Sequence, residues 1–561
     1  MNFKKIIVLN IWCMLYVFQA NAFQNEFQQT TKYKQFGLVW GLLKYHDPDI
    51  SKGKYDWNAV FLENINKIEI VKNQGELNNF LFGFISEFCS KNELSYKKQQ
   101  EELFEKNKDY EWIQKLPFTH EIKKKLEALS NNSDIGNYYP SISKLAMMPS
   151  FKNETEIANF NSANKSHRLL TFFSFWNAIQ YYNVNKYLMD IPWYEQIDNY
   201  IPHFLVADST LKYEKVKSEF IAALNDSHAF YVSPVVNDSL FQYKPAFGVK
   251  MVNDTLVVNS IRNKALAQVN NIKLGDLIVE VNDLDIPSSL KKRVGSIISH
   301  SNNSFLKKWA TWIFFNQYDS IKIKLKRGKD IESRYIKLYN NIQTEDYSYL
   351  KPKQILTKKQ LVNDGIGYIN LGSISKEELK AAFKKYATTK AIIIDLRNYP
   401  KNILERDIVK YLYPTKKRFI KVLFPLKGQP SYANFEKTAL SYIKDPFIAG
   451  SKNSNYYKGK VILLVNHTTQ SKAEFIGMAI QAAPNCITVG EQTAGSVMNI
   501  TTYKLPDGTP VNFTSLGAFY PNGDGAQKKG LKIDYVVNET ITNFLNDPYM
   551  IKAIELIEKK D

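Results

Sequence analysis

Apolar residues recur at helical spacing through the first 224 residues of the chain. They return every three or four positions in segments that capping and breaking residues separate. This spacing predicts helices over Thr31 to Tyr45, Glu76 to Cys89, Glu121 to Leu129, Leu169 to Asn183 and Lys212 to Leu224. We therefore expect a helical N-terminal domain over residues 23–231.

The pattern changes in the next hundred residues, where short β-branched runs are broken by Gly, Asn and Asp. Such runs are typical of strands. The predicted strands are Phe247 to Val252, Thr255 to Ile261, Leu277 to Val281 and Ser320 to Leu325. They indicate a small β-rich domain over residues 232–345.

From about Gln360 onward, strand-like runs alternate with segments of helical spacing, which predicts an α/β core over residues 346–561. The segments are Gly365 to Asn370, Lys376 to Tyr386, Ala391 to Asp395, Val461 to Val465, Ala473 to Gln481 and Ile487 to Val489, with a helical end at Asn543 to Lys560. The chain as a whole is therefore expected to be a multidomain α+β protein, and its 561 residues are long enough for several cores.

Residues 1–22 have the pattern of a secretory signal peptide. Lys4 and Lys5 precede an apolar run from Ile6 to Phe18, and Ala20-Asn21-Ala22 is typical of a cleavage site. The run is short for a membrane span, so a retained anchor is the less favoured alternative. We expect cleavage after Ala22, no stable membrane insertion afterwards, and an exported protein that is periplasmic or secreted. Two cysteines then remain, which permit at most one disulfide.

The charge is strongly basic, with 74 Lys and Arg against 55 Asp and Glu and a net charge of +19. Only eight of these basic residues are arginine, and the lysines are spread along the chain among acidic residues. Arginine is the residue that nucleic-acid sites prefer. The pattern therefore indicates a solvated lysine-rich surface and no nucleic-acid partner.

Ser471 is the most informative candidate for chemistry. The buried run Val461 to Val465 ends in a polar turn, and Ser471 stands where the next helix begins. Backbone N–H groups at such a helix start can hold a developing oxyanion while the hydroxyl points out of the turn. The alternative is a simple capping box, since Ser471-x-x-Glu474 precedes an apolar run.

Four ordered motifs make the chain resemble the C-terminal processing (tail-specific) serine peptidases, a family that includes the tricorn core protease. They are Asp395-Leu-Arg-Asn-Tyr-Pro400, the Thr-x-Ser-x-Ala-Glu run around Ser471, Gly490-Glu-Gln-Thr-Ala-Gly495, and Gln527-Lys-Lys-Gly-Leu-Lys-Ile-Asp534, where Ile533 replaces the usual proline. Phe36 to Tyr45 with Asp56-Trp57 also resembles exported bacterial members. The resemblance implies an α/β core of the ClpP/crotonase-like type.

The same resemblance implies a general base for Ser471. Many bacterial members place a lysine after the glycine turn, but this chain has Ser496 there. The tricorn-like branch uses a histidine preceded by a serine, which Ser227-His228 matches. Imidazole is a natural base near neutral pH. Ser227 would orient the ring, and Gln527 stands where that branch has a glutamate. The alternatives are His228 as a helix-terminal residue and His467 as the base.

For the oxyanion hole, the resemblance implies the backbone N–H of Lys472 and one from the loop after Asp395, where Lys401 is the candidate. That loop usually ends in Gly-Gly, but here it continues Pro400-Lys401-Asn402. Asp395 and Arg397 are expected to form a structural pair. The mechanism requires no metal and no organic cofactor.

The β-rich segment resembles a PDZ domain, through Lys244 to Val249 and the run Ala265 to Asp283. A PDZ fold adds an extended peptide to a sheet edge and binds the terminal carboxylate with backbone N–H groups. We therefore expect an exported serine endopeptidase whose partners are peptides or proteins. The alternatives are an occluded groove, a catalytically silent peptide-binding member, and a carrier of small apolar ligands like the family's retinoid-binding relatives.

Overall fold

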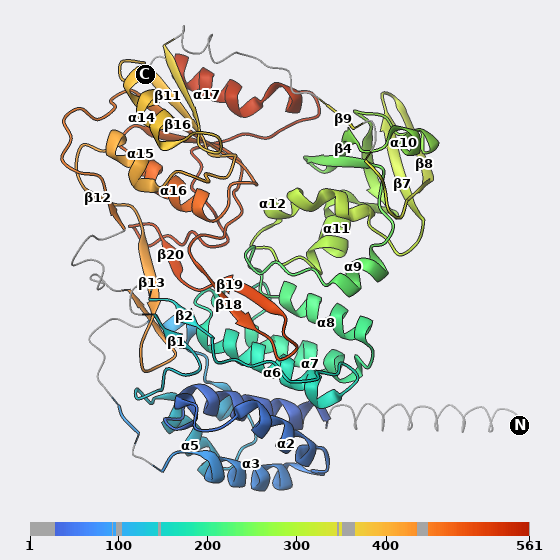
Figure 1. Ribbon diagram of the computed structural model, residues 1–561, viewed down its shortest axis with the longest axis vertical. Helices are drawn as coiled ribbons and strands as arrows, with labels where there is room; N and C mark the ends of the chain where they lie inside the picture. The colour runs from blue at the N-terminus through green and yellow to red at the C-terminus, as the bar shows by residue number, and fades with distance from the viewer. Residues whose placement is uncertain are drawn as a thin grey trace, which may run out of the picture.

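The computed structural model describes residues 29–91, 94–96, 104–143, 147–344, 347–350, 365–434 and 447–559. Three parts follow one another along the chain: a helical part over residues 29–240, a β-rich part over residues 247–349 and an α/β core over residues 365–559 (Figure 1). The predicted combination of a helical N-terminal region with a mixed core is confirmed. The predicted signal peptide, residues 1–22, lies outside the described residues.

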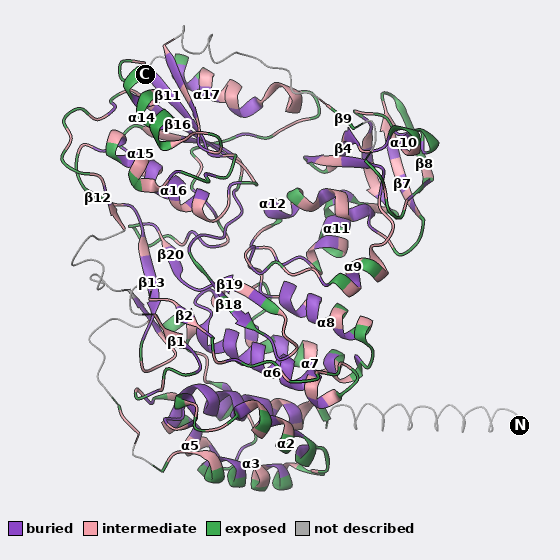
Figure 2. Cartoon of the chain, viewed as in Figure 1, coloured by how far each residue is buried: buried purple, intermediate pink, exposed green. Residues whose placement is uncertain are grey.

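The helical part is built around α6 (Lys165–Tyr182), which is buried along almost its whole length (Figure 2). Apolar and aromatic side chains lie on every side of this helix, and the other helices of this part cover them. All five predicted helices form. The helices of this part are residues 29–46, α2 (Trp57–Glu69), α3 (Gln74–Phe88), α4 (Trp112–Lys115), α5 (His120–Ser130), α6, α7 (Gln196–Val206), α8 (Thr210–Ala222) and α9 (Pro234–Leu240).

The β-rich part is an antiparallel sheet in the order β3-β4-β5-β7-β8, with β6 paired to β5 and β9 to β4. All four predicted strands form. The strands are β3 (Phe247–Val252), β4 (Thr255–Ile261), β5 (Leu277–Val281), β6 (Leu284–Asp285), β7 (Ser320–Arg327), β8 (Asp330–Lys337) and β9 (Ser348–Tyr349); the helices are α10 (Lys264–Val269), α11 (Ile286–Leu290), η5 (Lys291–Gly295), α12 (Asn303–Leu306) and η6 (Lys307–Phe314).

The core contains a parallel sheet in the order β10-β11-β16-β17-β21. Alternate residues of its strands face opposite sides: Ile392 and Ile394 pack toward α14, α15 and α16, whereas Ile393 packs toward α17. The elements are β10 (Ile366–Asn370), α14 (Lys376–Lys385), β11 (Ala391–Asp395), α15 (Glu405–Leu412), β16 (Lys460–Val465), α16 (Lys472–Gln481), β17 (Cys486–Gly490), β21 (Tyr535–Val536) and α17 (Pro548–Glu558).

Smaller sheets complete the fold. β13 (Lys421–Pro425) pairs with β14 (Tyr432–Asn434) and β20 (Gly517–Phe519), β1 (Ser141–Ile142) with β2 (Pro149–Ser150), and β12 (Lys417–Arg418) with β15 (Ile448–Ala449). The hairpin of β18 (Ile500–Lys504) and β19 (Pro510–Thr514) leaves the core and lies against α6–α8 (Figure 1). Tyr503 and Phe513 of this hairpin are buried in the hydrophobic cluster of the helical part.

Within the described ranges, no helix combines the length and apolar character needed to cross a membrane. Cys89 and Cys486 are free thiols, so they form no disulfide with each other. Burial raises the pKa of both thiols well above the ordinary value for cysteine. Neither thiol is therefore an activated nucleophile.

Candidate active site

Ser471 lies at the carboxyl edge of the parallel sheet, between the end of β16 and the first residue of α16. Its backbone has φ +58° and ψ −119°, the conformation of the first central residue of a type II′ turn, which glycine normally occupies. A side chain in such a conformation costs about 1–3 kcal/mol and is found mainly at functional sites. A capping serine has no need of this geometry, since Asn73, Ser209 and Ser375 cap their helices from extended backbone.

Glu474 holds the Ser471 turn in place. Its carboxylate accepts hydrogen bonds from the Ser471 N–H at 3.2 Å, the Gly495 N–H at 2.7 Å, the Ser496 N–H at 3.0 Å and the Thr493 hydroxyl at 2.5 Å. The side chain is fully buried, and this burial raises its pKa to about 7 despite the four donors. The glutamate half of the predicted capping box therefore forms, and Glu474 also joins the Ser471 turn to the glycine turn that follows β17.

The predicted oxyanion donors lie on adjacent segments. The Lys472 N–H belongs to the first residue of α16 and donates to no other residue in the part of the chain that the structure describes. The Lys472 side chain donates to the carbonyl oxygen of Lys401 at 3.0 Å, which brings the loop after β11 against the start of α16. The Lys472 N–H is thus free to bind an oxyanion at the residue next to Ser471.

His228 reaches the same region from the segment after α8. Its Nδ1 is 2.9 Å from the Thr514 hydroxyl at the end of β19, and its backbone N–H donates to Asp226 at 3.0 Å. Burial lowers the pKa of His228, and the nearby Asp226 carboxylate opposes this effect. Its Nε2 is buried and has no hydrogen-bond partner among the described residues.

His228 and Ser471 are carried by segments in direct contact, since the Gln470 side chain donates to the Ser227 carbonyl oxygen at 3.2 Å. No hydrogen bond joins the His228 ring to the Ser471 hydroxyl, although both residues are described. Such bonds are often long in free enzymes and shorten when substrate binds. The structure thus brings the two predicted residues to one place without closing the bond between them.

Ser227 and Gln527 lie beside this site, but neither makes the expected contact with the His228 ring. The Ser227 hydroxyl donates to the Ala494 carbonyl at 3.2 Å and accepts from the Ser301 N–H at 2.9 Å. The Gln527 side chain accepts from the Val497 N–H at 3.2 Å. Ser227 therefore contacts the glycine turn and Gln527 the residues just after it, and the orienting position beside His228 Nδ1 is taken by Thr514.

Ser496 stands where many bacterial members have a lysine. Its carbonyl oxygen accepts from the Ser471 N–H at 3.1 Å, and its own N–H donates to Glu474. The Ser496 hydroxyl is buried without a partner among the described residues. This position therefore contacts the backbone of Ser471, but it supplies no amine.

His467, the alternative base, is engaged in a different contact. Its Nδ1 is 2.6 Å from Glu491 Oε1, and Lys307 of the β-rich part lies 2.5 Å from Oε2 of the same carboxylate. Although burial opposes the effect, His467 and Lys307 lower the pKa of Glu491 to about 2. This network joins the nucleophile turn to the β-rich part.

The expected pair of Asp395 and Arg397 forms, with distances of 2.9 and 2.7 Å between the guanidinium and the carboxylate oxygens. Arg397 also binds Asp547 at the start of α17 at 2.7 Å. The Thr468 hydroxyl donates to the Arg397 carbonyl oxygen at 2.6 Å. The pair therefore supports the loop next to the nucleophile turn.

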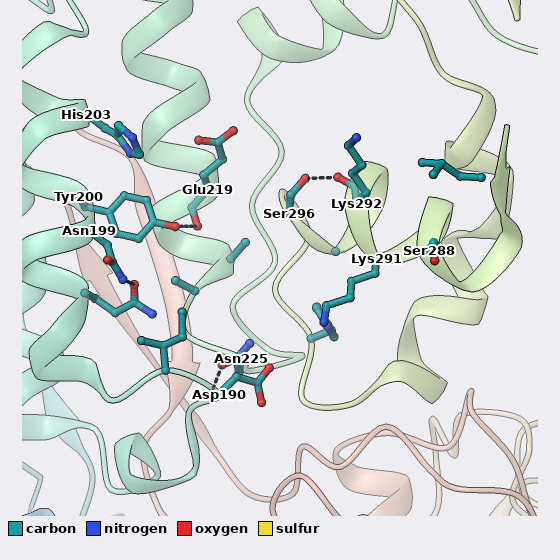
Figure 3. Close-up of a pocket in the computed structure, with 17 residues that line it drawn as sticks. Asp190, Asn199, Tyr200, His203, Glu219, Asn225, Ser288, Lys291, Lys292 and Ser296 are labelled. Carbon is teal, nitrogen blue, oxygen red and sulfur yellow. Dashed lines mark hydrogen bonds between the residues drawn. The ribbon is translucent and has the colours of Figure 1, made fainter. Parts of the chain in front are cut away.

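A cleft of about 950 Å³ opens between the helical part and the β-rich part (Figure 3). Its walls are formed by α7 and α8 on one side and by α11 and η5 on the other, and Lys291 points into it. Asn225, three residues before His228, lines the cleft and accepts from the Asp190 N–H at 2.8 Å. Lys528, next to Gln527, forms an ion pair with Asp190. The cleft thus borders the segments that carry the candidate site.

Residues 365–537 match the family model described as Peptidase family S41. The chain carries a peptidase family S41 domain. This domain includes Ser471 and Gln527, whereas His228 lies outside it. The resemblance seen in the motifs is therefore confirmed at the level of the family.

The chain is also similar to individual peptidases of known sequence or structure. The chain is 23% identical over 365 residues to the chloroplastic carboxyl-terminal-processing peptidase 1 of Arabidopsis thaliana, a match that covers 61% of this chain and 66% of that protein. The chain therefore matches just under two thirds of that relative's length. The structure of mature CPAF is 13% identical and has a TM-score of 0.52, and the match covers 70% of this chain and 97% of that chain. The structure of mature CPAF with lactacystin is also 13% identical, has a TM-score of 0.51, and covers 70% of this chain and 98% of that chain. At this identity the likeness shows a shared fold.

Sequence reasoning missed two residues of the site, Asp226 and Thr514. Asp226 directly precedes Ser227-His228, so a carboxylate next to the candidate base was visible in the sequence. Thr514 is 286 residues away from His228 in the chain. Only the path of the β18–β19 hairpin brings it to the ring, and no local pattern could have predicted this contact.

Proposed function

We propose that this protein is an exported serine endopeptidase of the C-terminal processing type. The observation that carries the proposal is the backbone of Ser471, which is held at positive φ at the head of α16 beside the unpaired N–H of Lys472. This geometry presents a hydroxyl and an oxyanion donor to the same space. The presence of an S41 domain supports peptide bonds as the target.

In the proposed reaction, Ser471 Oγ attacks the carbonyl carbon of the scissile peptide as His228 Nε2 takes the hydroxyl proton. The Lys472 N–H, with a second donor from the Lys401 loop, stabilises the negative oxygen. The C–N bond then breaks, and His228 returns the proton to the leaving amine. A water molecule that His228 deprotonates hydrolyses the acyl-enzyme and restores the serine.

The β-rich part is proposed to capture C-terminal or extended segments of the substrate in the manner of a PDZ domain. β3 is an edge strand, which can accept an added peptide strand. Its Val249 N–H already donates to the Thr311 hydroxyl of η6 at 3.2 Å. Peptide addition along β3 therefore requires η6 to move aside. The cleft of Figure 3, which α11 and η5 of this part line, reaches Asn225, three residues before His228.

The proposal is tested with a fluorophosphonate probe and a mixed peptide library analysed by mass spectrometry. Wild-type protein should be labelled and should cleave peptides. Ser471→Ala should lose both properties, whereas His228→Ala should retain folding and lose at least about a hundredfold in turnover. Labelling that persists in Ser471→Ala would refute the nucleophile assignment. The matched control is Ser209→Ala, a serine that caps α8 at the end opposite to His228.

A second candidate is a catalytically silent peptide-binding protein. The missing hydrogen bond between His228 and Ser471 favours this function, as does the orientation of Ser227 and Gln527 away from the ring. It predicts peptide binding by residues 240–340 with neither turnover nor probe labelling. The same library experiment, combined with a peptide-binding measurement on Ser471→Ala, separates the two functions.

A further inference from the structure

We propose that Asp226 and Thr514 position the His228 ring and select its tautomer, so that Nε2 faces the reaction as a proton acceptor. The inference rests on the proposed function for its catalytic consequence. The hydrogen bonds that link the Asp226 carboxylate to the Thr514 hydroxyl and this hydroxyl to the His228 ring do not depend on that function.

The number of hydrogens fixes the direction of each bond. The Thr514 hydroxyl has a single hydrogen, which it donates to Asp226 Oδ1 at 2.9 Å. The same oxygen lies 2.9 Å from His228 Nδ1 and can only accept there. In the neutral ring Nδ1 must therefore carry the single hydrogen, and Nε2 must hold a lone pair.

Asp226 is itself held rigidly. Oδ1 also accepts from the His228 N–H at 3.0 Å, and Oδ2 accepts from the Thr514 N–H at 2.6 Å. The Asp226 N–H donates to the Ser299 hydroxyl at 3.0 Å. Asp226, Thr514 and His228 thus form a closed set in which the ring cannot turn over without breaking the bond at Nδ1.

The second ring nitrogen of His228, Nε2, is free to accept a proton, as this tautomer requires. Nε2 is buried without a partner among the described residues, although buried polar atoms are nearly always paired. An unpaired buried acceptor is destabilising, and a proton donor such as the Ser471 hydroxyl would satisfy it when the site closes. The chain Asp226–Thr514–His228 therefore performs the orienting role that the resemblance assigned to Ser227 and Gln527.

The test compares Thr514→Val with Thr514→Ser in the full-length protein, using kcat and KM for a cleaved library peptide. Valine has nearly the same shape but lacks the hydroxyl, whereas serine keeps it. We expect Thr514→Val to lower kcat at least about tenfold with KM within about twofold, and Thr514→Ser to remain within about threefold of wild type. Thr501→Val is the matched control, because this buried hydroxyl of the same hairpin binds the Pro149 carbonyl and not His228.

A second measurement does not depend on activity. The ¹⁵N spectrum of histidine-labelled protein, assigned with His228→Gln, should show the Nδ1–H tautomer for His228 in wild type and a mixture in Thr514→Val. An Nε2–H tautomer in wild type would overturn the inference, and so would equal kcat in Thr514→Val and wild type. If Ser471→Ala retains turnover, the proposed function fails instead, while the tautomer measurement still decides the positioning.

Discussion

The tip of the β18–β19 hairpin is clamped by α8 through a buried ion pair between Lys217 and Asp507. The two charged atoms are 2.6 Å apart, and the side chains are 2% and 5% exposed. Asp507 also accepts from the Tyr213 hydroxyl at 2.7 Å, and Lys217 from α8 also contacts Glu214 at 2.7 Å. Because Thr514 is at the other end of this hairpin, the clamp connects the stability of the helical part to the position of His228.

The perturbation is Lys217→Met, which keeps the length of the side chain and removes its charge. Asp507 is then left buried with no cation, and breaking a buried pair in this way costs about 3–5 kcal/mol. For a unit of 150–250 residues, 1 kcal/mol lowers Tm by about 2–4 °C, so we expect a loss of roughly 6–20 °C. In Lys217→Met/Asp507→Asn the stranded charge is gone and the amide can still bind Tyr213, so the double variant should recover at least about 2 kcal/mol.

The sign of the pH effect follows from the pKa of Asp507, which burial would raise but Lys217 lowers below its ordinary value. A carboxyl with a lowered pKa stabilises the fold above its unfolded pKa, and this stabilisation is lost as the pH falls through the folded value. Without Lys217, burial raises the pKa of Asp507, so the cost of Lys217→Met should be largest at pH 7 and shrink progressively as the pH falls. Thermal unfolding followed by circular dichroism measures both effects. A loss below about 1 kcal/mol at pH 7, or a double variant less stable than Lys217→Met, would refute the reasoning.

Three further predictions concern the candidate site. Lys472→Ala keeps the backbone N–H but loses the bond to the Lys401 carbonyl oxygen, so kcat/KM should fall by about tenfold or less. A hundredfold loss would mean that the side chain takes part in the reaction. Burial raises the pKa of Glu474 to about 7, above its unfolded value of 4.5, so the ionised form destabilises the fold as pH rises through this window. Thermal unfolding should therefore show Glu474→Gln gaining about 3 kcal/mol relative to wild type between pH 5 and pH 8, and a constant difference would contradict this. The pKa of Glu491 is lowered to about 2, so Glu491→Gln should cost up to about 3 kcal/mol at pH 7 and progressively less from about pH 4.5 toward pH 2. An equal Tm loss at pH 7 and pH 3 would count against the Lys307–Glu491–His467 network.

The sequence by itself determined the local elements and the position of Ser471 at a helix start. Hydrophobic spacing predicted strands such as Phe247 to Val252 and Ala391 to Asp395 with their observed bounds, because side-chain alternation is a local property. The run from Val461 through Ser471 also contains all that is needed to place a serine at a helix start. Glu474 was visible as a capping residue for the same reason.

The tertiary structure alone decided how His228, the proposed base, is held. Ser227 precedes His228 as the resemblance requires, yet its hydroxyl turns to Ser301 and Ala494, since side-chain direction depends on the surrounding backbone. The residue that contacts the ring is Thr514, which a hairpin carries from the core into the helical part. Contacts between residues nearly three hundred positions apart depend on how whole elements pack, and hydrophobic spacing contains no information about that packing.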